Sequence, residues 1–487
     1  MTTVHPEIER SGVSAPILEL NGINVIDPVE RKGKPSNLFW PWCAANVGVL
    51  GMGYAAYLLF HGVSFLQALV AGVIGIIGSF LLVGFSALAG KRGSAPTMIL
   101  SRAPFGVLGN RLPSLVSYLL LVGWEIVTMV LAISAVGVIF ERLGWSTGTA
   151  TKIGSFVVVA GVIAVAGTLG FDVIMRFQKW ITYLMILLTI GFVIITASHI
   201  HPSALKSLPT GGVAAFVGAV IFAFTGFGLS WANTAADYSR YLPTSVRGSS
   251  VVGWTTFGAS VGPVLLILDG LLLTGSDPAL LTAVGNDPIG GLGTILPTWY
   301  LVPFILVALL GLIGSAVLDI YSSGLALLSL GLKTKRHIAV SIDVVIMVLG
   351  TVYLVWIAAG SFLGSFTGFL ITLGVPIAAW TGIFLADMLL RRRNYAEADL
   401  YSSRGRYGAA NVSAVALMLL GSGVGFGLVV STAEWLAWQG YLLAPLHLGP
   451  KNGTWANANL GVVISLAIGF VGYLALNRRR VRTQESV

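Results

Sequence analysis

Long apolar runs are the feature that most restricts what this chain of 487 residues can fold into. A helix needs about 20 mainly apolar residues to cross the roughly 30 Å of hydrocarbon in a bilayer. With 56% hydrophobic and only 10% charged residues, the chain also carries more apolar surface than one water-soluble core can bury. The sequence therefore predicts an all-α integral membrane protein with twelve transmembrane helices, at about 38–60, 64–89, 113–140, 152–170, 180–199, 213–238, 250–275, 298–330, 339–359, 361–390, 411–431 and 457–477.

The basic residues test this helix count, because Lys and Arg accumulate in the loops on the cytoplasmic side of a membrane. When successive loops are assigned to alternate sides, most basic residues fall on one side, including Arg176 and Lys179 in a loop before the fifth helix. The other side receives Arg142, Lys152, Lys206 and Lys451. This bias predicts a multi-pass protein of the cell membrane with both termini in the cytoplasm. It also accounts for the net charge of +9 without a nucleic-acid partner.

Several kinds of chemistry find no support in the sequence. Cys43 is the only cysteine, so an internal disulfide and a CxxC metal or redox site are excluded. No GxxxxGK[ST] loop is present to bind ATP. The histidines all lie in tails, loops or predicted helix ends. We therefore expect no cofactor, no metal site and no enzymatic activity, which leaves a channel or a secondary transporter.

Two of the predicted helices are interrupted by glycine and polar residues. The first interruption is "WCAANVGVLGMGY" at 42–54, and the second is "FTGFGLSWAN" at 224–233, five helices later. Secondary transporters are often built from two inverted repeats with broken helices at corresponding positions, where freed backbone groups hold the substrate and the ion. We expect the sixth helix to break at 224–228.

This interpretation divides the chain into five parts. Repeat one would span 38–199 and repeat two 213–391, each with five helices. The last two helices, at 411–477, would lie outside the repeats. Residues 1–37 and 478–487 would be cytoplasmic tails. Neither a repeated filter sequence nor polar stripes on several helices are present, so a secondary transporter is favoured over a channel.

Five segments in order along the chain resemble the purine–cytosine permeases of the nucleobase–cation symporter family one. They are "NLFWPWCAAN" (37–46), "GKRGSAPTMILSRAPFGVLGNRLP" (90–113), "VGWEIV" (122–127), "WANTAADYSRYLP" (231–243) and "LDIYSSGLAL" (318–327). The resemblance implies a leucine-transporter-type fold of five plus five inverted helices and two more. It also implies import of a nucleobase, cytosine or a purine, by cation symport through alternating access.

A flat heterocycle needs aromatic faces for stacking and a few polar groups for its edge. By motif position, the resemblance implies that Trp124 and Trp231 sandwich the base. Thr128, one turn after Trp124, and Ser230 are candidates for the edge contacts, or they bond back to their own helices. The freed backbone at Gly228 is a further candidate, and Asn46 would either cap the first break or touch the substrate. We expect the other tryptophans considered to lie at the membrane interface: Trp40, Trp42, Trp145, Trp180, Trp435 and Trp438.

An ionisable residue at membrane depth is a functional candidate. Asp319 stands where relatives typically carry an asparagine, so it could bind the base edge and carry a proton. Sodium-dependent relatives resemble one another in a hydroxyl pair just before that position, whereas here only Ser315 is close to it. This difference favours H⁺ over Na⁺ as the coupled cation. Glu125, which points away from the stacking face, is a second proton candidate.

The end of the sixth helix and the choice of substrate give two further expectations. Asp237 precedes Arg240 by three residues, which predicts an ion pair at the end of the sixth helix. The alternative function on the same scaffold is symport of allantoin, a hydantoin or a vitamin, with sodium as the alternative cation. The expected partners are thus a small heterocycle, a co-transported cation and the lipid bilayer.

Overall fold

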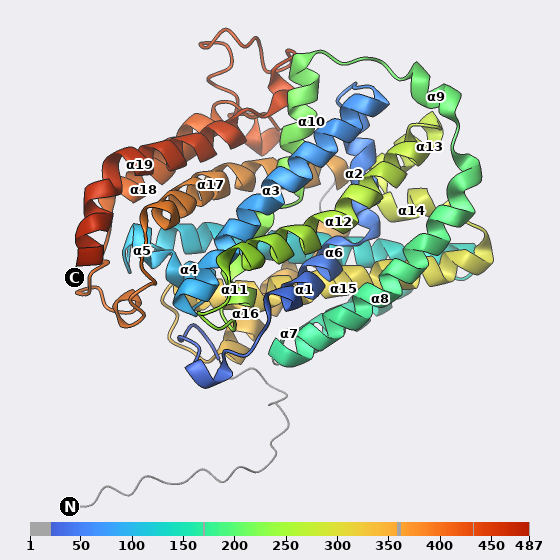
Figure 1. Cartoon of the computed structure of the whole chain (residues 1–487). Helices are drawn as coiled ribbons and strands as arrows, with labels where there is room; N and C mark the ends of the chain where they lie inside the picture. Colours follow the sequence, from blue (N-terminus) through green and yellow to red (C-terminus); the bar gives the residue numbers. More distant parts are fainter. Residues whose placement is uncertain (1–20, 169–170, 358–361, 432, 487) are drawn as a thin grey trace, which may run out of the picture.

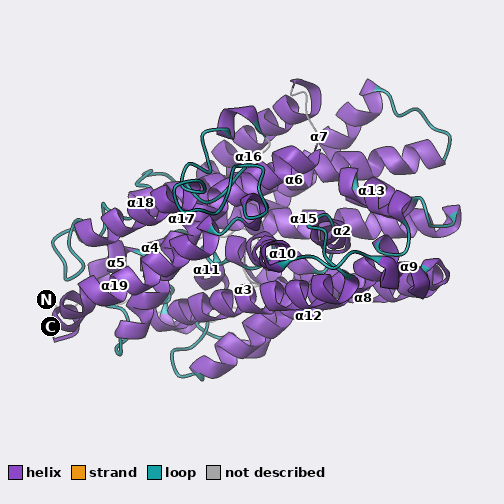
Figure 2. Ribbon diagram, turned by 90° about the horizontal axis from the view of Figure 1, so that it is seen from above, coloured by secondary structure: helices purple, strands orange, loops and turns teal. Residues whose placement is uncertain are grey.

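The computed structural model describes residues 21–168, 171–357, 362–431 and 433–486, and these residues form helices and loops without a strand (Figures 1 and 2). The longer helices are α1 (Phe39–Asn46), α2 (Val49–Leu59), α3 (Phe65–Gly93), α6 (Arg111–Arg142), α7 (Thr149–Thr168), α8 (Phe171–Thr196), α10 (Val213–Gly226), α12 (Gly248–Thr274), α13 (Pro278–Asn286), α15 (Thr298–Ser329), α16 (Arg336–Val352), α17 (Phe362–Leu390), α18 (Val412–Phe426) and α19 (Gly461–Ser486). Short helices lie between them: α4 (Thr97–Leu100), α5 (Arg102–Phe105), α9 (Pro202–Ser207), α11 (Ala235–Ser239) and α14 (Pro288–Gly293).

The number of apolar helices agrees with a polytopic membrane protein. In the described residues, 10 helices are long and apolar enough to cross a membrane, and a bent pair at 35–59 makes up to 11. The predicted helix at 411–431 forms only the shorter α18, which ends at Phe426. Glycine stabilises helices poorly, and four glycines occur between 421 and 427. The prediction of an all-α integral membrane protein is confirmed.

Several helix boundaries differ from the prediction because charged residues at helix ends were assigned to loops. Helix α8 begins at Phe171, so Arg176 and Lys179 lie within it. The ammonium group of Lys179 lies 5.4 Å from the ring centre of Trp40. Long basic side chains can belong to a membrane helix and still place their charge near its end. Helix α19 likewise continues through the basic run after 477, as far as Ser486.

The core of the bundle is built from helices that touch many others. Helix α3 packs against α10, α11 and α12, while α15 packs against α6, α8 and α16. Small residues allow the closest approaches: a Cβ atom added at Gly228 would lie 2.4 Å from the backbone carbon of Ser79 on α3. Both halves of the broken helix α1–α2 pack against α12, and α1 also packs against α8 and α15 (Figure 1).

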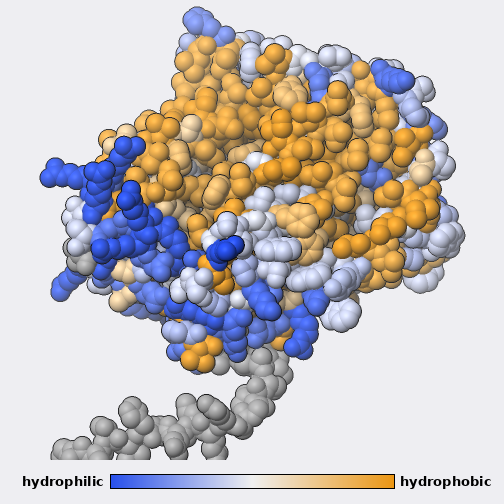
Figure 3. Space-filling view, in the orientation of Figure 1, coloured by the Kyte–Doolittle hydropathy of each residue, from blue (hydrophilic) through white to orange (hydrophobic). Residues whose placement is uncertain are grey.

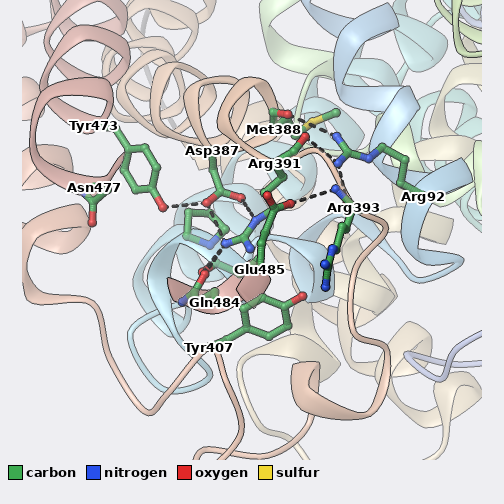
Figure 4. A network of polar contacts seen from close by, with 12 residues as sticks. Arg92, Asp387, Met388, Arg391, Arg393, Tyr407, Tyr473, Asn477, Gln484 and Glu485 are labelled. Atoms are coloured by element: carbon green, nitrogen blue, oxygen red, sulfur yellow. Dashed lines mark hydrogen bonds and ion pairs between the residues drawn. The ribbon is translucent and has the colours of Figure 1, made fainter. Parts of the chain in front are cut away.

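A polar network ties α19 to the end of α17 (Figure 4). The buried carboxylate of Asp387 pairs with Arg391 at 2.6 Å and accepts a hydrogen bond from the Tyr473 hydroxyl at 2.7 Å. Arg391 also donates to Gln484 near the end of α19. The guanidinium of Arg92, at the end of α3, donates to the backbone carbonyls of Met388, Arg391 and Arg393. These contacts fasten three helices together at one end of the bundle.

The surface separates into an apolar and a basic region. Figure 3 shows a broad hydrophobic area over α3, α12 and α8, whereas hydrophilic residues gather at lower left, around the end of α19. Exposed apolar side chains such as Leu187, Leu265 and Ile194 cover the sides of the bundle. In water such a surface would drive aggregation, so it is the lipid-facing side of a membrane protein.

Candidate functional site

A cavity of about 70 Å³ lies beside both helix interruptions. It is bounded by the first break, by α6, by the end of α10, by α14 and by α15. Its walls consist of Ala45, Asn46, Val47, Gly48, Val49, Leu50, Gly51, Tyr54, Trp124, Thr128, Gly226, Phe227, Trp231, Ile289, Ala308, Gly311, Leu312 and Ser315.

The first break separates α1 from α2. Gly48 is extended, with φ −155° and ψ 160°, and the helical segments on either side of it meet at 62°. The side-chain amide of Asn46 donates to the carbonyl of Trp42 at 2.8 Å. Asn46 therefore bonds within the last turn of α1 and also forms part of the cavity wall, so both roles considered for it are compatible with the structure.

The second break follows α10. The helix ends at Gly226, and Phe227 leaves helical geometry with φ −97° and ψ −91°. A short 3-10 turn at Leu229–Trp231 and a non-helical stretch lead to α11. The break therefore begins within the predicted range and extends further along the chain. Tyr54, from the helix after the first break, donates a hydrogen bond to the carbonyl of Gly226 at 3.4 Å.

Trp124 and Trp231 reach this cavity from different helices. Trp124 lies in the middle of α6, where its ring packs edge-on against Phe366 and Phe369 of α17. Its indole nitrogen is buried without a hydrogen-bond partner. Trp231 is 8% exposed and packs edge-on against Trp42, with ring centres 5.7 Å apart. Two aromatic side chains thus border one cavity.

The predicted polar contacts divide into two groups. Thr128 lines the cavity, but its hydroxyl donates back to the carbonyl of Trp124 at 2.6 Å. Ser230 and Gly228 do not line it. The Ser230 hydroxyl donates to the carbonyl of Phe227 at 3.1 Å. The amide of Gly228 donates to the Ser79 hydroxyl at 3.0 Å, so this glycine allows close packing on α3.

The candidate coupling residues lie on one side of the cavity. Ser315 of α15 forms part of the wall, and the carboxyl group of Asp319, one turn later, lies beside it. Asp319 is 2% exposed and does not line the cavity itself. Glu125 is fully buried and faces Asp319 and Asp343 of α16, away from the space between the two tryptophans. This orientation agrees with the direction expected from its helical position.

Two sequence-based expectations near the site are wrong. Trp42 is completely buried, not interfacial, because α1 enters the bundle before its second turn and packs this ring on Trp231. Asp237 forms no ion pair within 4 Å of Arg240. Its carboxylate instead accepts from the amide and hydroxyl of Thr97. The guanidinium of Arg240 donates to the Tyr321 hydroxyl and to a backbone carbonyl near the N-terminus.

Sequence reasoning also missed residues that surround the site. Tyr54 and Phe227 could have been noticed because both lie within the interrupted segments. Asp343 gave a weaker signal, as a single acid in an otherwise apolar run of α16. Ile289 also lines the cavity. It belongs to the short helix α14, and no pattern in this part of the sequence predicts such a contact.

Residues 25–443 match the model of a family described as permeases for cytosine/purines, uracil, thiamine and allantoin. The chain belongs to this permease family. A putative purine-cytosine permease of Bacillus subtilis, YxlA, is 24% identical over 96% of this permease and 97% of its own length. The resemblance seen in the sequence motifs is confirmed.

Solved structures show that the fold of this permease is also shared. MHP1, described as a nucleobase-cation-symport-1 family transporter with bromovinylhydantoin bound in a closed conformation, has a TM-score of 0.71 at 17% identity, covering 95% of this permease and 96% of MHP1. A Na⁺-coupled sialic acid symporter has a TM-score of 0.60 at 11% identity, covering 93% and 91%. These likenesses show a shared fold, whereas it is the match to the permease family that indicates an integral membrane transporter rather than an enzyme.

Proposed function

We propose that this permease imports a nucleobase, cytosine or a purine, by proton symport through alternating access. The observation that carries the proposal is that Trp124 and Trp231 border one cavity at the meeting point of two broken helices. A base would stack between the two rings. Asn46, Thr128 and Ser315 would supply polar contacts at its edge, and Asp319 would reach the edge if Ser315 turned aside.

The proposed architecture has twelve membrane crossings, with α18 as a short one and α1–α2 as one broken crossing. Repeats one and two, at 38–199 and 213–391, would be related by inversion, and 411–477 would follow them. The basic end of the bundle would face the cytoplasm, together with the tails 1–37 and 478–487, in the plasma membrane. The packing of the two broken helices against each other, through Tyr54 and Gly226, supports this arrangement.

Proton coupling is favoured by the buried acids beside the cavity. One cation entering down a membrane potential of 100 mV supplies about 2.3 kcal/mol, enough for roughly 40-fold accumulation at about 1.4 kcal/mol per tenfold. The alternative is allantoin, hydantoin or vitamin symport with sodium. It is favoured by the position of Ser315 in the wall next to the backbone of the first break, where oxygen atoms could bind a sodium ion.

Uptake by the reconstituted chain tests the proposal. Liposomes would be given radiolabelled cytosine, adenine, hypoxanthine, uracil or allantoin under an imposed proton or sodium gradient. We expect accumulation of cytosine or a purine with the proton gradient alone. Accumulation driven by sodium alone in the presence of a protonophore would contradict proton coupling, and transport of allantoin but of no nucleobase would favour the alternative.

A further inference from the structure

Three carboxyl groups from three different helices meet behind the candidate cavity. Glu125 belongs to α6, Asp319 to α15 and Asp343 to α16, and these helices pack against one another. Their exposed fractions are 0%, 2% and 0%. Glu125 faces both aspartates, and Asp319 faces Asp343. We call these residues the acid cluster.

The acid cluster has its polar contacts mainly within itself and with nearby serines. Glu125 interacts with Asp343 and Ser323, and Asp319 interacts with Ser315. Both side-chain oxygens of Glu125 and one oxygen each of Asp319 and Asp343 are buried without a well-formed hydrogen bond. The other oxygen of Asp343 accepts from the hydroxyl of Ser323. In the described parts of the chain, ion pairs form elsewhere, between Arg31 and Glu397, Arg391 and Asp387, and Arg406 and Asp399.

A second side chain points to the same place. Tyr118 lies two turns before Glu125 on α6 and is 6% exposed. Its buried hydroxyl is aimed at the carboxyl group of Asp343 but forms no well-formed hydrogen bond in this structure. A buried hydroxyl aimed at buried carboxyl groups makes a polar compartment that can hold an exchangeable proton, because poorly paired buried polar groups are otherwise costly.

The other charged and titratable groups nearby are engaged outside the cluster. Tyr238 of α11, which faces Asp319, donates to the carbonyl of Leu318. The guanidinium of Arg336, in the first turn of α16, lies 4.6 Å from the ring centre of Tyr321 and donates to the carbonyl of Gly167. None of the ion pairs among the described residues joins these three carboxyl groups to a Lys or Arg. Three ionised carboxylates would repel one another in a medium of low dielectric constant, which favours the protonated form of most of them.

We propose that Glu125, Asp319 and Asp343 form one proton-binding site that couples proton movement to the substrate cavity. Ser315 connects Asp319 with the cavity wall. A proton entering from the cavity converts a carboxylate of the cluster to a carboxylic acid, and the same O–H bond breaks when the proton leaves on the other side.

This inference deepens the proposed function and rests on its proton coupling. The key variant is Asp343→Asn. Asp343 is the member of the cluster farthest from the substrate cavity, since the contacts run from Ser315 in the cavity wall to Asp319 and then to Asp343. Asp269→Asn is the matched control, since Asp269 of α12 is also buried, at 6% exposure, and has one unpartnered oxygen but lies outside the cluster. Both variants would be reconstituted as full chains in liposomes.

Gradient-driven accumulation and base counterflow distinguish the coupling of protons to transport from the movement of the base itself. With an inside-alkaline gradient of one pH unit, one-proton symport permits about tenfold accumulation. We expect the unchanged chain and Asp269→Asn to approach this value and Asp343→Asn to reach a ratio near one. Base counterflow, which needs no net proton movement, should continue in Asp343→Asn. Tenfold accumulation in Asp343→Asn, or loss of accumulation and counterflow together, would overturn the inference.

An infrared measurement keeps the test independent of the substrate. Protonated carboxyl groups give a distinct carbonyl-stretch band, which should be present in the unchanged chain at neutral pH. Glu125→Gln should remove the component of this band that comes from Glu125 and should also shift the component that comes from Asp343, which is identified by its loss in Asp343→Asn. Asp269→Asn should leave the Asp343 component unchanged. If no base is transported by the unchanged chain, the proposed function fails, while independent bands for Glu125 and Asp343 would separately reject the acid cluster.

Discussion

The hydroxyl of Tyr54 donates a hydrogen bond to the backbone carbonyl of Gly226 and thereby joins the two broken helices. Gly226 is the last residue of α10, so no later residue of that helix can bond its carbonyl. The tyrosine ring also packs edge-on against Phe227, with ring centres 4.7 Å apart. One side chain therefore satisfies the carbonyl and covers the residue at which α10 ends.

Removing this hydroxyl tests its role at the break. We expect Tyr54→Phe to lower the stability of the detergent-solubilised protein by about 0.5–1.5 kcal/mol, the usual contribution of one hydrogen bond. Thermal unfolding would measure the loss. Tyr57→Phe is the matched control, because the hydroxyl of Tyr57 is buried without a partner and its removal should be neutral or stabilising. Equal destabilisation by both changes would contradict the role given to the Tyr54 bond.

Loss of either cavity tryptophan should weaken base binding. Stacking on an aromatic side chain contributes roughly 1–3 kcal/mol per base, which corresponds to about a 5- to 140-fold change in Kd. We expect this range for Trp124→Ala and for Trp231→Ala when binding is measured by scintillation proximity. Trp254→Ala, at a 40% exposed position on α12, is the control and should bind as the unchanged chain does. Unchanged binding in both cavity variants would refute the proposed stacking.

The close contact at Gly228 should not tolerate even a methyl group. A Cβ atom there would lie 2.4 Å from the backbone carbon of Ser79, which cannot move without displacing α3. We expect Gly228→Ala to cost about 1–3 kcal/mol, as overpacking usually does. Gly253→Ala, where no atom lies within 4 Å, should be neutral or stabilise the helix by up to about 1 kcal/mol. Comparing apparent melting temperatures distinguishes the two outcomes.

The buried ion pair of α17 should matter more than an exposed one. Asp387→Ala leaves Arg391 buried without its carboxylate, a change that typically costs about 3–5 kcal/mol. The pair between Arg406 and Asp399 is partly exposed, with exposed side-chain fractions of 26% and 29%. We expect Asp399→Ala to cost about 1 kcal/mol or less. Equal losses of thermal stability in the two variants would show that burial does not decide the contribution.

Much of the fold could be predicted because the bilayer restricts it so strongly. Apolar runs of sufficient length can only be helices, and this rule located most of the long helices to within a few residues. The rule failed where charged residues belong to a membrane helix. Arg176 and Lys179 look like loop residues but lie in the first three turns of α8, where the ammonium group of Lys179 contacts the rings of Trp40 and Tyr183.

The candidate site was predictable only where a local pattern marked it. The interrupted segments led to Asn46 and Trp231, and the motif around Trp124 led to the opposite wall. Asp343 could not be assigned to the site, because Glu125 and Tyr118, which it faces, belong to α6, far away in the sequence. The expected pair of Asp237 and Arg240 failed for the same reason, since Thr97 and Tyr321 compete successfully for these two side chains.

The two ends of α17 have a practical consequence for following transport in real time. Near its start, Phe366 and Phe369 touch Trp124, and near its other end Asp387 and Arg391 hold the end of α19. A spectroscopic label on the last turn of α19 therefore lies next to the end of α17, the helix that contacts Trp124 of the cavity. The distance from this label to a second label on α12 would report whether α17 moves relative to α12 during each transport cycle.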